Sequence, residues 1–186
     1  MLELKFQFSL GAALLAFAGS SYGAAVITEY TPTTGRGCTT ISSNHETGDT
    51  VKRCRGVAGF ALLVFNSDDR ASISLVTKNN ATIPLDFWDV VTPTFSTLGQ
   101  KVEWQMASVD GKKTPVALVV RVHTVDQTNV EAPRPLSFLV VAEIRSDKAC
   151  VIGKIPAWQP KANESARALA RARGSKCMPQ IHQPSS

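Results

Sequence analysis

The chain has 186 residues, 20 of them Lys or Arg and 15 Asp or Glu, which gives a formal net charge of +5. This length normally corresponds to a single domain with its own hydrophobic core, and it argues against a multidomain protein. The charge excess is modest. We interpret it as ordinary surface charge that favours encounters with anionic surfaces such as envelope lipids or acidic glycans.

The N-terminus has the layout of an export signal. Lys5 precedes an apolar core, and the small residues Ser21 and Gly23 follow it at a plausible cleavage site. The apolar core is about eleven residues long, well short of the roughly 20 residues that a helix needs to cross a bilayer. We therefore expect residues 1–23 to be removed, and the mature chain, which has no second apolar segment of spanning length, to be periplasmic or secreted.

The segment 24–56 is rich in Thr, Ser, Gly and charged residues and has no sustained hydrophobic period. This composition predicts an irregular polar arm. The arm carries two of the four cysteines that remain after export, which are Cys38, Cys54, Cys150 and Cys177. An even number of cysteines suits an oxidising compartment.

Three disulfide pairings are possible, and spacing alone does not fix the connectivity. The short separations favour Cys38–Cys54 and Cys150–Cys177, and each local loop would contribute on the order of 3 kcal/mol in the chain-entropy model. The sequence has no CxxC pair and no Cys and His residues at the spacing of a structural zinc site. We therefore predict no redox-active pair and no metal site.

From Val57 onward, short runs of β-branched and aromatic residues alternate with turn residues, which is typical of antiparallel strands joined as hairpins. The third run is weakened as a strand because Pro84 cannot donate a backbone hydrogen bond to a neighbour. Seven runs fit this pattern: 57–65, 71–77, 81–87, 101–109, 115–124, 136–145 and 149–155.

The segment 86–100 concentrates three aromatic side chains, Phe87, Trp88 and Phe95, around Pro93 without a helical or strand period. One interpretation is an aromatic platform for a ligand. The other is a long loop anchored to the core by side chains that each bury a large area, which is the commoner outcome for such residues. In either case this loop is the best candidate for the wall of a pocket.

The long runs after residue 100 alternate apolar and polar residues, and four charged or titratable side chains lie on their more polar faces: Glu103, Arg121, His123 and Glu143. A buried arginine without a partner is costly. We therefore expect Arg121 to pair with Glu103 or Glu143 across neighbouring strands, or to stay in water. In the alternative, the four side chains converge as an anion site or an acid/base group. The strand register is left open, because a one-residue slip inverts a whole strand.

A helix is predicted at 163–173, in the stretch NESARALARAR. Asn163 is a good N-cap, Arg173 complements the negative end of the helix dipole, and Gly174 stands where a left-handed stop residue belongs. The alanine-rich face can approach a sheet closely. We expect the helix arginines to form a solvated face rather than a patch for nucleic acid or lipid. The tail 178–186, rich in Pro, Gln and Ser, is expected to be mobile.

These elements predict an α+β, mainly β fold: an antiparallel meander of six or seven strands, as a curved sheet, sandwich or open barrel, followed by one C-terminal helix. The expected organisation is a cleaved signal peptide, a polar arm, a single β-rich domain and a mobile tail, at 1–23, 24–56, 57–177 and 178–186.

Motifs of known chemistry are absent from the sequence. There is no GxSxG turn, no GxxxxGK[ST] phosphate loop, no HExxH helix and no EF-hand loop. The three histidines, His45, His123 and His182, lie far apart along the chain. We therefore assign no catalytic residue and no cofactor from the sequence.

Several stretches together resemble a known family: RCRG, DDR, LGQKVEW, PVALVVRV, LSFLVVAEI, ACVIGKIPA, NESARALA and KC, over about residues 52–177. The chain resembles a family of small, uncharacterised exported (periplasmic) proteins of alphaproteobacteria, a domain of unknown function. The resemblance implies export and carries over no catalytic residue. It also implies that Glu103 and Arg121 occupy recurring positions. An arginine commonly follows the EW pair in that pattern, whereas Gln105 stands here.

Our leading hypothesis is a non-enzymatic binding or envelope-associated module. Its surface would be the polar sheet face with Glu103, Arg121, His123 and Glu143, together with the aromatic loop of Phe87, Trp88 and Phe95. Its partner would be an anionic envelope component or an acidic protein, and not nucleic acid.

Three alternatives remain open. The first is a small periplasmic hydrolase that uses His123 with a carboxylate such as Glu143, which requires both groups within hydrogen-bond reach in one cleft. The second is an inhibitor of an envelope enzyme. That enzyme would have to be acidic, because a protein of charge +5 repels a basic one. The third is a structural role in the envelope through the basic helix.

Overall fold

The computed structural model describes residues 26–109, 111–129 and 131–181. The predicted signal segment 1–23 lies outside the described residues. Within the described part of the chain, no helix is both long and apolar enough to span a bilayer.

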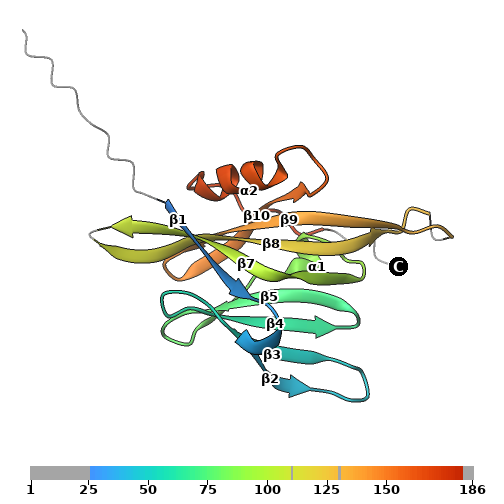
Figure 1. The fold of residues 1–186 in the computed structure, drawn as a ribbon. Helices are drawn as coiled ribbons and strands as arrows, with labels where there is room; N and C mark the ends of the chain where they lie inside the picture. The colour runs from blue at the N-terminus through green and yellow to red at the C-terminus, as the bar shows by residue number, and fades with distance from the viewer. Residues whose placement is uncertain (1–25, 110, 130, 182–186) are drawn as a thin grey trace, which may run out of the picture.

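The described residues form two five-stranded antiparallel sheets that stack face to face, with one helix on the outer face of the first (Figure 1). Sheet A has the strand order β1-β7-β8-β9-β10, and sheet B has the order β2-β3-β4-β5-β6. The elements are β1 (Val26–Pro32), η1 (Gly35–Gly37), β2 (Cys38–Ser43), β3 (Thr50–Arg55), β4 (Ala61–Ser67), β5 (Arg70–Val76), β6 (Thr82–Pro84), α1 (Phe87–Val90), β7 (Ser96–Val109), β8 (Lys112–Asp126), β9 (Arg134–Arg145), β10 (Lys148–Pro156) and α2 (Ala162–Arg171).

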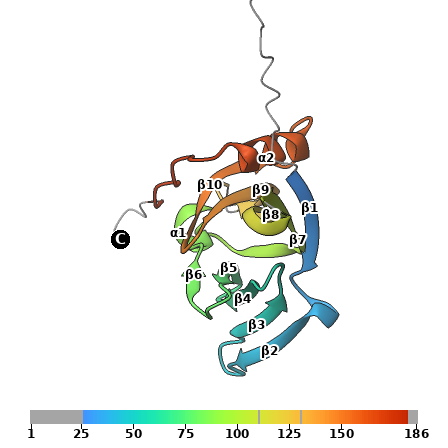
Figure 2. The same ribbon diagram turned by 90° about the vertical axis from the view of Figure 1, so that its left-hand side faces the viewer.

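A view turned by 90° shows the same three layers, with α2 above sheet A and sheet B below it (Figure 2). The predicted fold class, mainly β with one C-terminal helix, is therefore confirmed in its sandwich form. As predicted, Pro84 lies in a short strand, β6, at the edge of sheet B.

The prediction of an irregular arm at 24–56 is wrong, because this segment forms β1, β2 and β3. These three strands bring the total in the described residues to ten, instead of the six or seven predicted. Strand β1 forms the edge of sheet A along β7, and β2 pairs with β3 in sheet B, where Cys38 lies opposite Cys54. Five of the six side chains of β2 are exposed, so its sequence lacks the alternation that reveals a half-buried strand.

The main core lies between the two sheets. The alternation of apolar and polar residues correctly predicted which face of the sheet A strands is buried there. Trp104 of β7 and Leu118 of β8 are fully buried and lie opposite each other in the register. The indole Nε1–H of Trp104 donates to Thr31 Oγ1 of β1 at 2.8 Å. This bond satisfies the polar end of a large buried side chain and ties the edge strand to the core.

Helix α2 packs on the outer face of sheet A through alanine. Ala162, Ala166 and Ala170 are buried in a second apolar cluster with side chains of β8, β9 and β10. A Cβ on Gly153 of β10 would lie 2.6 Å from Leu169 Cδ2, so the missing side chain permits this close approach. The predicted alanine contact is therefore present.

The helix ends differ from the prediction by one or two residues. The helix spans Ala162–Arg171 instead of 163–173, and Asn163 lies in its first turn instead of at the N-cap. The N-cap is Lys161, with a left-handed backbone and no side-chain capping bond. Gly174 has φ of +78°, the left-handed conformation predicted for it.

Two disulfides join Cys38 to Cys54 and Cys150 to Cys177, the pairs that the short separations favour. The second ties the segment after α2 to β10. Beyond it, the Met178 amide donates to the Val151 carbonyl at 2.7 Å, and the Ile181 amide donates to the Asp89 carbonyl. Residues 178–181 of the predicted mobile tail are thus bonded to β10 and α1, and 182–186 lie outside the described residues.

Candidate functional site

The carboxylate of Glu103 on β7 is bound by a side chain of helix α2, which covers the outer face of sheet A. Arg167 donates to it through two nitrogens, Nε to Oε1 and Nη2 to Oε2, both at 2.8 Å. The Tyr30 hydroxyl donates to Oε2 at 3.0 Å, and Gln105 Nε2 donates to Oε1 at 2.7 Å. Burial works to raise the pKa of Glu103, but these bonds and the charge of Arg167 outweigh it and hold the pKa below its ordinary value.

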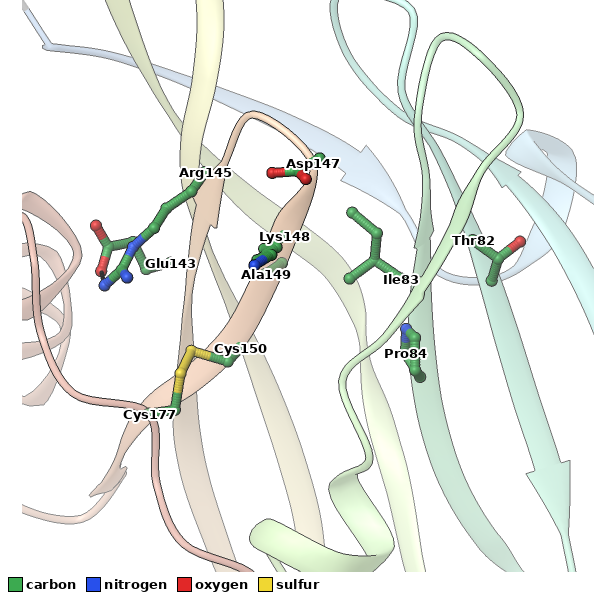
Figure 3. A pocket seen from close by; sticks show the side chains of 10 residues that line it. All are labelled: Thr82, Ile83, Pro84, Glu143, Arg145, Asp147, Lys148, Ala149, Cys150 and Cys177. Atoms are coloured by element: carbon green, nitrogen blue, oxygen red, sulfur yellow. Dashed lines mark hydrogen bonds and ion pairs between the residues drawn. A yellow bond between two sulfur atoms is a disulfide. The ribbon is translucent and has the colours of Figure 1, made fainter.

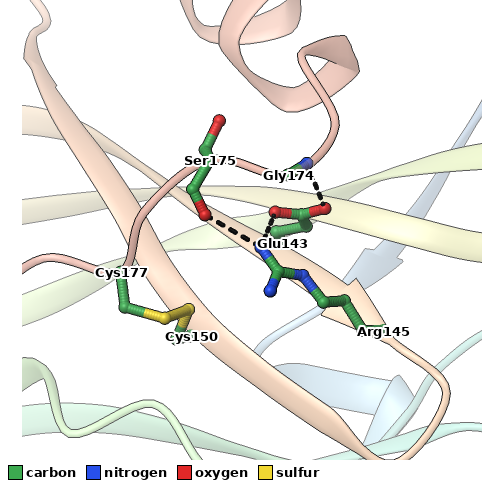
Figure 4. The surroundings of a disulfide bond; sticks show 6 residues. All are labelled: Glu143, Arg145, Cys150, Gly174, Ser175 and Cys177. Carbon is green, nitrogen blue, oxygen red and sulfur yellow. Dashed lines mark hydrogen bonds and ion pairs between the residues drawn. A yellow bond between two sulfur atoms is a disulfide. The ribbon is translucent and has the colours of Figure 1, made fainter.

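Glu143 on β9 is bound in the same way at the other end of the helix, and its side chain is only 2 % exposed. Arg145 Nη2 donates to it at 2.8 Å and the Gly174 amide at 3.0 Å (Figure 4). Arg173 Nε lies 3.4 Å from Oε1 of the same carboxylate. The bond from Arg145 lowers the pKa of Glu143 against the opposing effect of burial, with help from Gly174 and Arg173. Arg145 also donates to the Ser175 carbonyl at 2.8 Å.

These two carboxylates therefore attach the helix and the segment after it to sheet A. Arg167 lies one turn before the buried Ala170 on the same side of the helix, whereas Arg173 lies just past the end of the helix, in the segment that leads to Gly174. The prediction that the helix arginines form a purely solvated face is wrong for these two.

The predicted cross-strand pair between Arg121 and a carboxylate is also wrong. Glu143 lies opposite Ala117 in the register, four residues from Arg121, which corresponds to roughly 14 Å along a strand. Glu103 is nearer, opposite Val119, but its oxygens are bonded to Arg167 and its neighbours. Among the described residues no carboxylate forms an ion pair with Arg121, whose Nη1 donates to Ser137 Oγ at 3.1 Å.

A bulge in β7 lies directly beside Arg121. The register runs from Leu98 opposite Val122 to Val102 opposite Val120, so residues 99–101 together face one residue of β8. A Cβ on Gly99 would lie 2.9 Å from Arg121 Cβ, so a glycine is needed at this approach. Sequence periodicity gives no warning of such an insertion.

The bulge, the outer face of β8 and the first turn of α2 enclose a cavity of about 670 Å³, which we call the cationic cavity. Lys101, Arg121 and His123 line it, with Lys101 Nζ 4.6 Å from the centroid of the Tyr30 ring. Its carboxylate, Glu103, is neutralised by Arg167. Asn163 also lines the cavity, and the start of a helix adds positive partial charge there. The cavity is therefore positive.

Of the seven predicted site residues, three line this cavity: Glu103, Arg121 and His123. The three predicted aromatic residues lie in different environments. Phe87 is fully buried in the core, and Trp88 lies against Arg70, whose guanidinium carbon is 5.5 Å from the ring centroid. Phe95 is 54 % exposed and lines an adjoining cavity. The prediction of a long loop is wrong, because Phe87 and Trp88 lie in the short helix α1 and residues 96–100 belong to β7. The buried Phe87 fits the interpretation of an aromatic anchor, whereas Phe95 is exposed and could serve as a platform.

Glu143 lines a different cavity, of about 420 Å³, at the seam between β10 and β6 (Figure 3). Ile83 and Pro84 of β6 face Ala149 and the Cys150–Cys177 disulfide across it. Because Glu143 is already bonded to the chain after α2, this cavity does not offer that carboxylate to a ligand.

The sequence did not reveal Tyr30, Lys101 or Asn163 as lining residues, nor Arg167 as the partner of Glu103. One signal was available, because a carboxylate in an otherwise apolar strand needs a cation and the predicted helix supplies Arg167, Arg171 and Arg173. Tyr30 and Lys101 depend on β1 and on the bulge, neither of which has a sequence signature.

The structure also bears on acid/base and metal chemistry. His123 lies opposite Ser137, six residues along β9 from Glu143, which corresponds to roughly 20 Å. A His123–Glu143 pair at hydrogen-bond reach is therefore not formed. Within the described ranges, no group of three or more His, Cys, Asp or Glu side chains is placed to hold a metal ion.

No family model, curated protein or solved structure matches the chain.

Proposed function

We propose that this chain is an exported, non-enzymatic binding protein that holds an anionic ligand in the cationic cavity. One observation carries the proposal. The half-buried guanidinium of Arg121 lines a cavity of about 670 Å³ and, over the described ranges, has only a hydroxyl as a hydrogen-bonding partner. A buried or half-buried arginine is normally paired with an anion, so a ligand would supply the missing partner.

The geometry of the guanidinium favours a carboxylate, phosphate or sulfate group. Arginine presents five N–H donors in a rigid fork that matches two oxygens of such a group. Ser137 takes one of these donors, and Lys101 adds a second full positive charge to the cavity. His123, at the far side, can add a further donor. The field of these groups would also attract an anion from solution.

The same geometry argues against a hydrolase. A general base must accept a proton within hydrogen-bond reach of the substrate. Glu103 is surrounded by donors, and its lowered pKa makes it a weak base. Across the described residues, no carboxylate forms an ion pair with His123 that could orient it. A binding role therefore accounts for the cavity better than catalysis does.

Export rests on two features. The layout of residues 1–23 predicts a signal peptide, and the two disulfides fit a compartment where thiols are oxidised. A ligand from an anionic envelope component suits this placement. An acidic protein partner, including an acidic enzyme held by an inhibitor, and an envelope role for the helix stay predictions without a specific contact that favours them.

The test is a titration of the mature protein with phosphate, citrate and glucuronate, followed by NMR of the backbone amides. We expect the amides of residues 99–101 and of Arg121 and His123 to shift. The Arg121→Gln variant should bind roughly 10- to 100-fold more weakly, since it loses charge-assisted hydrogen bonds. The matched control is Arg53→Gln, an exposed arginine of β3 in the other sheet, which should leave the affinity unchanged. Equal losses in both variants, or no shift with any anion, would contradict the proposal.

A further inference from the structure

We infer that the anion is the acid group of an oligosaccharide, whose uncharged rings extend from the cationic cavity past His123 onto Phe95. This inference rests on the proposed function and names the class of its ligand. It depends on a second cavity, of about 500 Å³, next to the first.

The two cavities share one lining residue, His123. Arg121, His123 and Val125 alternate along the outer face of β8, and Val125 lines the second cavity. From Arg121 to Val125 the strand extends roughly 14 Å, which is longer than one sugar ring. The surface therefore suits a ligand of at least two linked units.

Phe95 gives the second cavity an exposed apolar face on a hydrogen-bonded backbone. Its side chain is 54 % exposed, whereas Phe87 of α1 is fully buried. The backbone around Phe95 is fixed, because its carbonyl accepts from Thr124 Oγ1 at 2.9 Å and the next amide, of Ser96, donates to the Asp69 carbonyl at 2.9 Å. A rigid aromatic ring of this kind can stack on the C–H face of a sugar at little entropic cost.

The polar side chains around Phe95 are those that bind hydroxyl groups. Asn66, Asp69 and Thr97 line the same cavity. An amide and a hydroxyl can each donate to and accept from sugar hydroxyls, and a carboxylate can accept from them. The carboxylate of Asp69 forms no ion pair within residues 26–109, 111–129 and 131–181, and it would repel an acid group. The charge pattern therefore fits a ligand with its acid at the Arg121 end and neutral rings at the Phe95 end.

An acidic peptide fits this surface less well. Extended peptides commonly bind by adding a strand to an exposed sheet edge. Both cavities lie over the faces of β7 and β8, and β8 has a paired strand on each side. Beyond the end of β1, the Gln100 carbonyl of β7 accepts from the Thr33 amide and the Ser96 amide donates to the Asp69 carbonyl, so these backbone groups are not left open for an added strand. The observations thus favour recognition by side chains, as a sugar requires.

The experiment is a binding screen with oligosaccharides of two to four units that carry one terminal uronic or sialic acid, their neutral counterparts, and triglutamate as the peptide. The affinities of the strongest binder and of its free acidic monosaccharide are then measured by calorimetry. We expect the acidic oligosaccharides to bind and the neutral ones and triglutamate to bind far more weakly.

Two variants test the two cavities separately, one at Phe95 and one at Arg121. Phe95→Ala should weaken the oligosaccharide on the order of tenfold and leave the monosaccharide unchanged, because only the longer ligand reaches the ring. Arg121→Gln should weaken both. The control is Ile41→Ala, another exposed apolar side chain, on β2 of sheet B, which should change neither.

The two proposals fail in different ways. If small anions bind through Arg121 but no acidic oligosaccharide binds more tightly than its monosaccharide, or if triglutamate binds best, the oligosaccharide inference is overturned and the anion site stands. If Phe95→Ala has no effect on the longer ligand, the inference is equally overturned. If no anion binds at all, both proposals fall.

Discussion

The outer face of sheet A has two halves, one covered by α2 and one open. The charged side chains of the two halves differ in whether the protein supplies them with a partner of opposite charge. Under the helix, Glu103 and Glu143 are each bonded to arginines from α2 or the segment after it. In the open half, Arg121 has only Ser137 as a partner among the described residues. The same alternation along the strands produces both halves. What differs is whether another element of the chain covers the charged side chain.

This difference separates charges that hold the structure together from charges left for a ligand. A covered carboxylate with several donors stabilises the attachment of the helix. A half-buried cation facing a cavity costs desolvation free energy and gains no ion pair from the protein.

Glu143→Gln should cause the largest loss of stability. It removes the charge that two arginines and the Gly174 amide surround, in a side chain that is only 2 % exposed. Because Arg145 and Arg173 are half exposed and can turn to water, we expect a loss of about 2 kcal/mol rather than the full cost of breaking a buried pair. Urea unfolding measures it, and Glu164→Gln, at an exposed helix carboxylate, is the control. A loss no larger than that of the control would contradict the assignment.

Glu103→Gln should have a smaller effect, about 1 kcal/mol, because an amide keeps some of the hydrogen bonds to Arg167 and Tyr30. The change should be local to the helix. Amide hydrogen exchange of α2 should speed up more than exchange in sheet B, and uniform acceleration across both would show that Glu103 has no particular link to the helix.

Acid should weaken the covered half gradually. The pKa values of Glu103 and Glu143 are lowered in the folded protein from the ordinary value of 4.5, so the unfolded chain binds more protons as the pH falls. The stabilisation is complete above about pH 4.5 and is lost as the pH falls through the lowered folded-state pKa values. Unfolding curves between pH 7 and pH 3 measure it. The double variant Glu103→Gln, Glu143→Gln should show a flatter dependence, and an unchanged dependence would rule these two carboxyls out.

The inner faces of the long strands could be predicted from the sequence, because one-sided burial imposes a period of two that Val102, Trp104 and Met106 display. The local disulfides followed from short separations. Strands β1 to β3 could not be predicted, since an edge strand such as β2 buries few side chains and carries no apolar alternation.

The candidate site was only partly predictable for a related reason. Arg121, His123 and Glu103 were visible as polar residues in apolar strands. Their partners depend on the register, which the bulge at 99–101 sets, and on where α2 lies. Glu143 and Arg121 are both charged residues in apolar strands. The sequence therefore could not show that Glu143 is bonded to the segment after α2 whereas Arg121 is not.

The most direct test of this division is the unfolding free energy of Arg121→Gln with and without a saturating anion. Without the anion, the variant should lie within about 0.5 kcal/mol of the wild type, since no ion pair is lost. With the anion at 100 times its Kd, the wild type should gain about 2.7 kcal/mol, and the variant should gain far less. A variant as unstable as Glu143→Gln, with the full gain on adding the anion, would show that Arg121 supports the fold and does not bind the ligand.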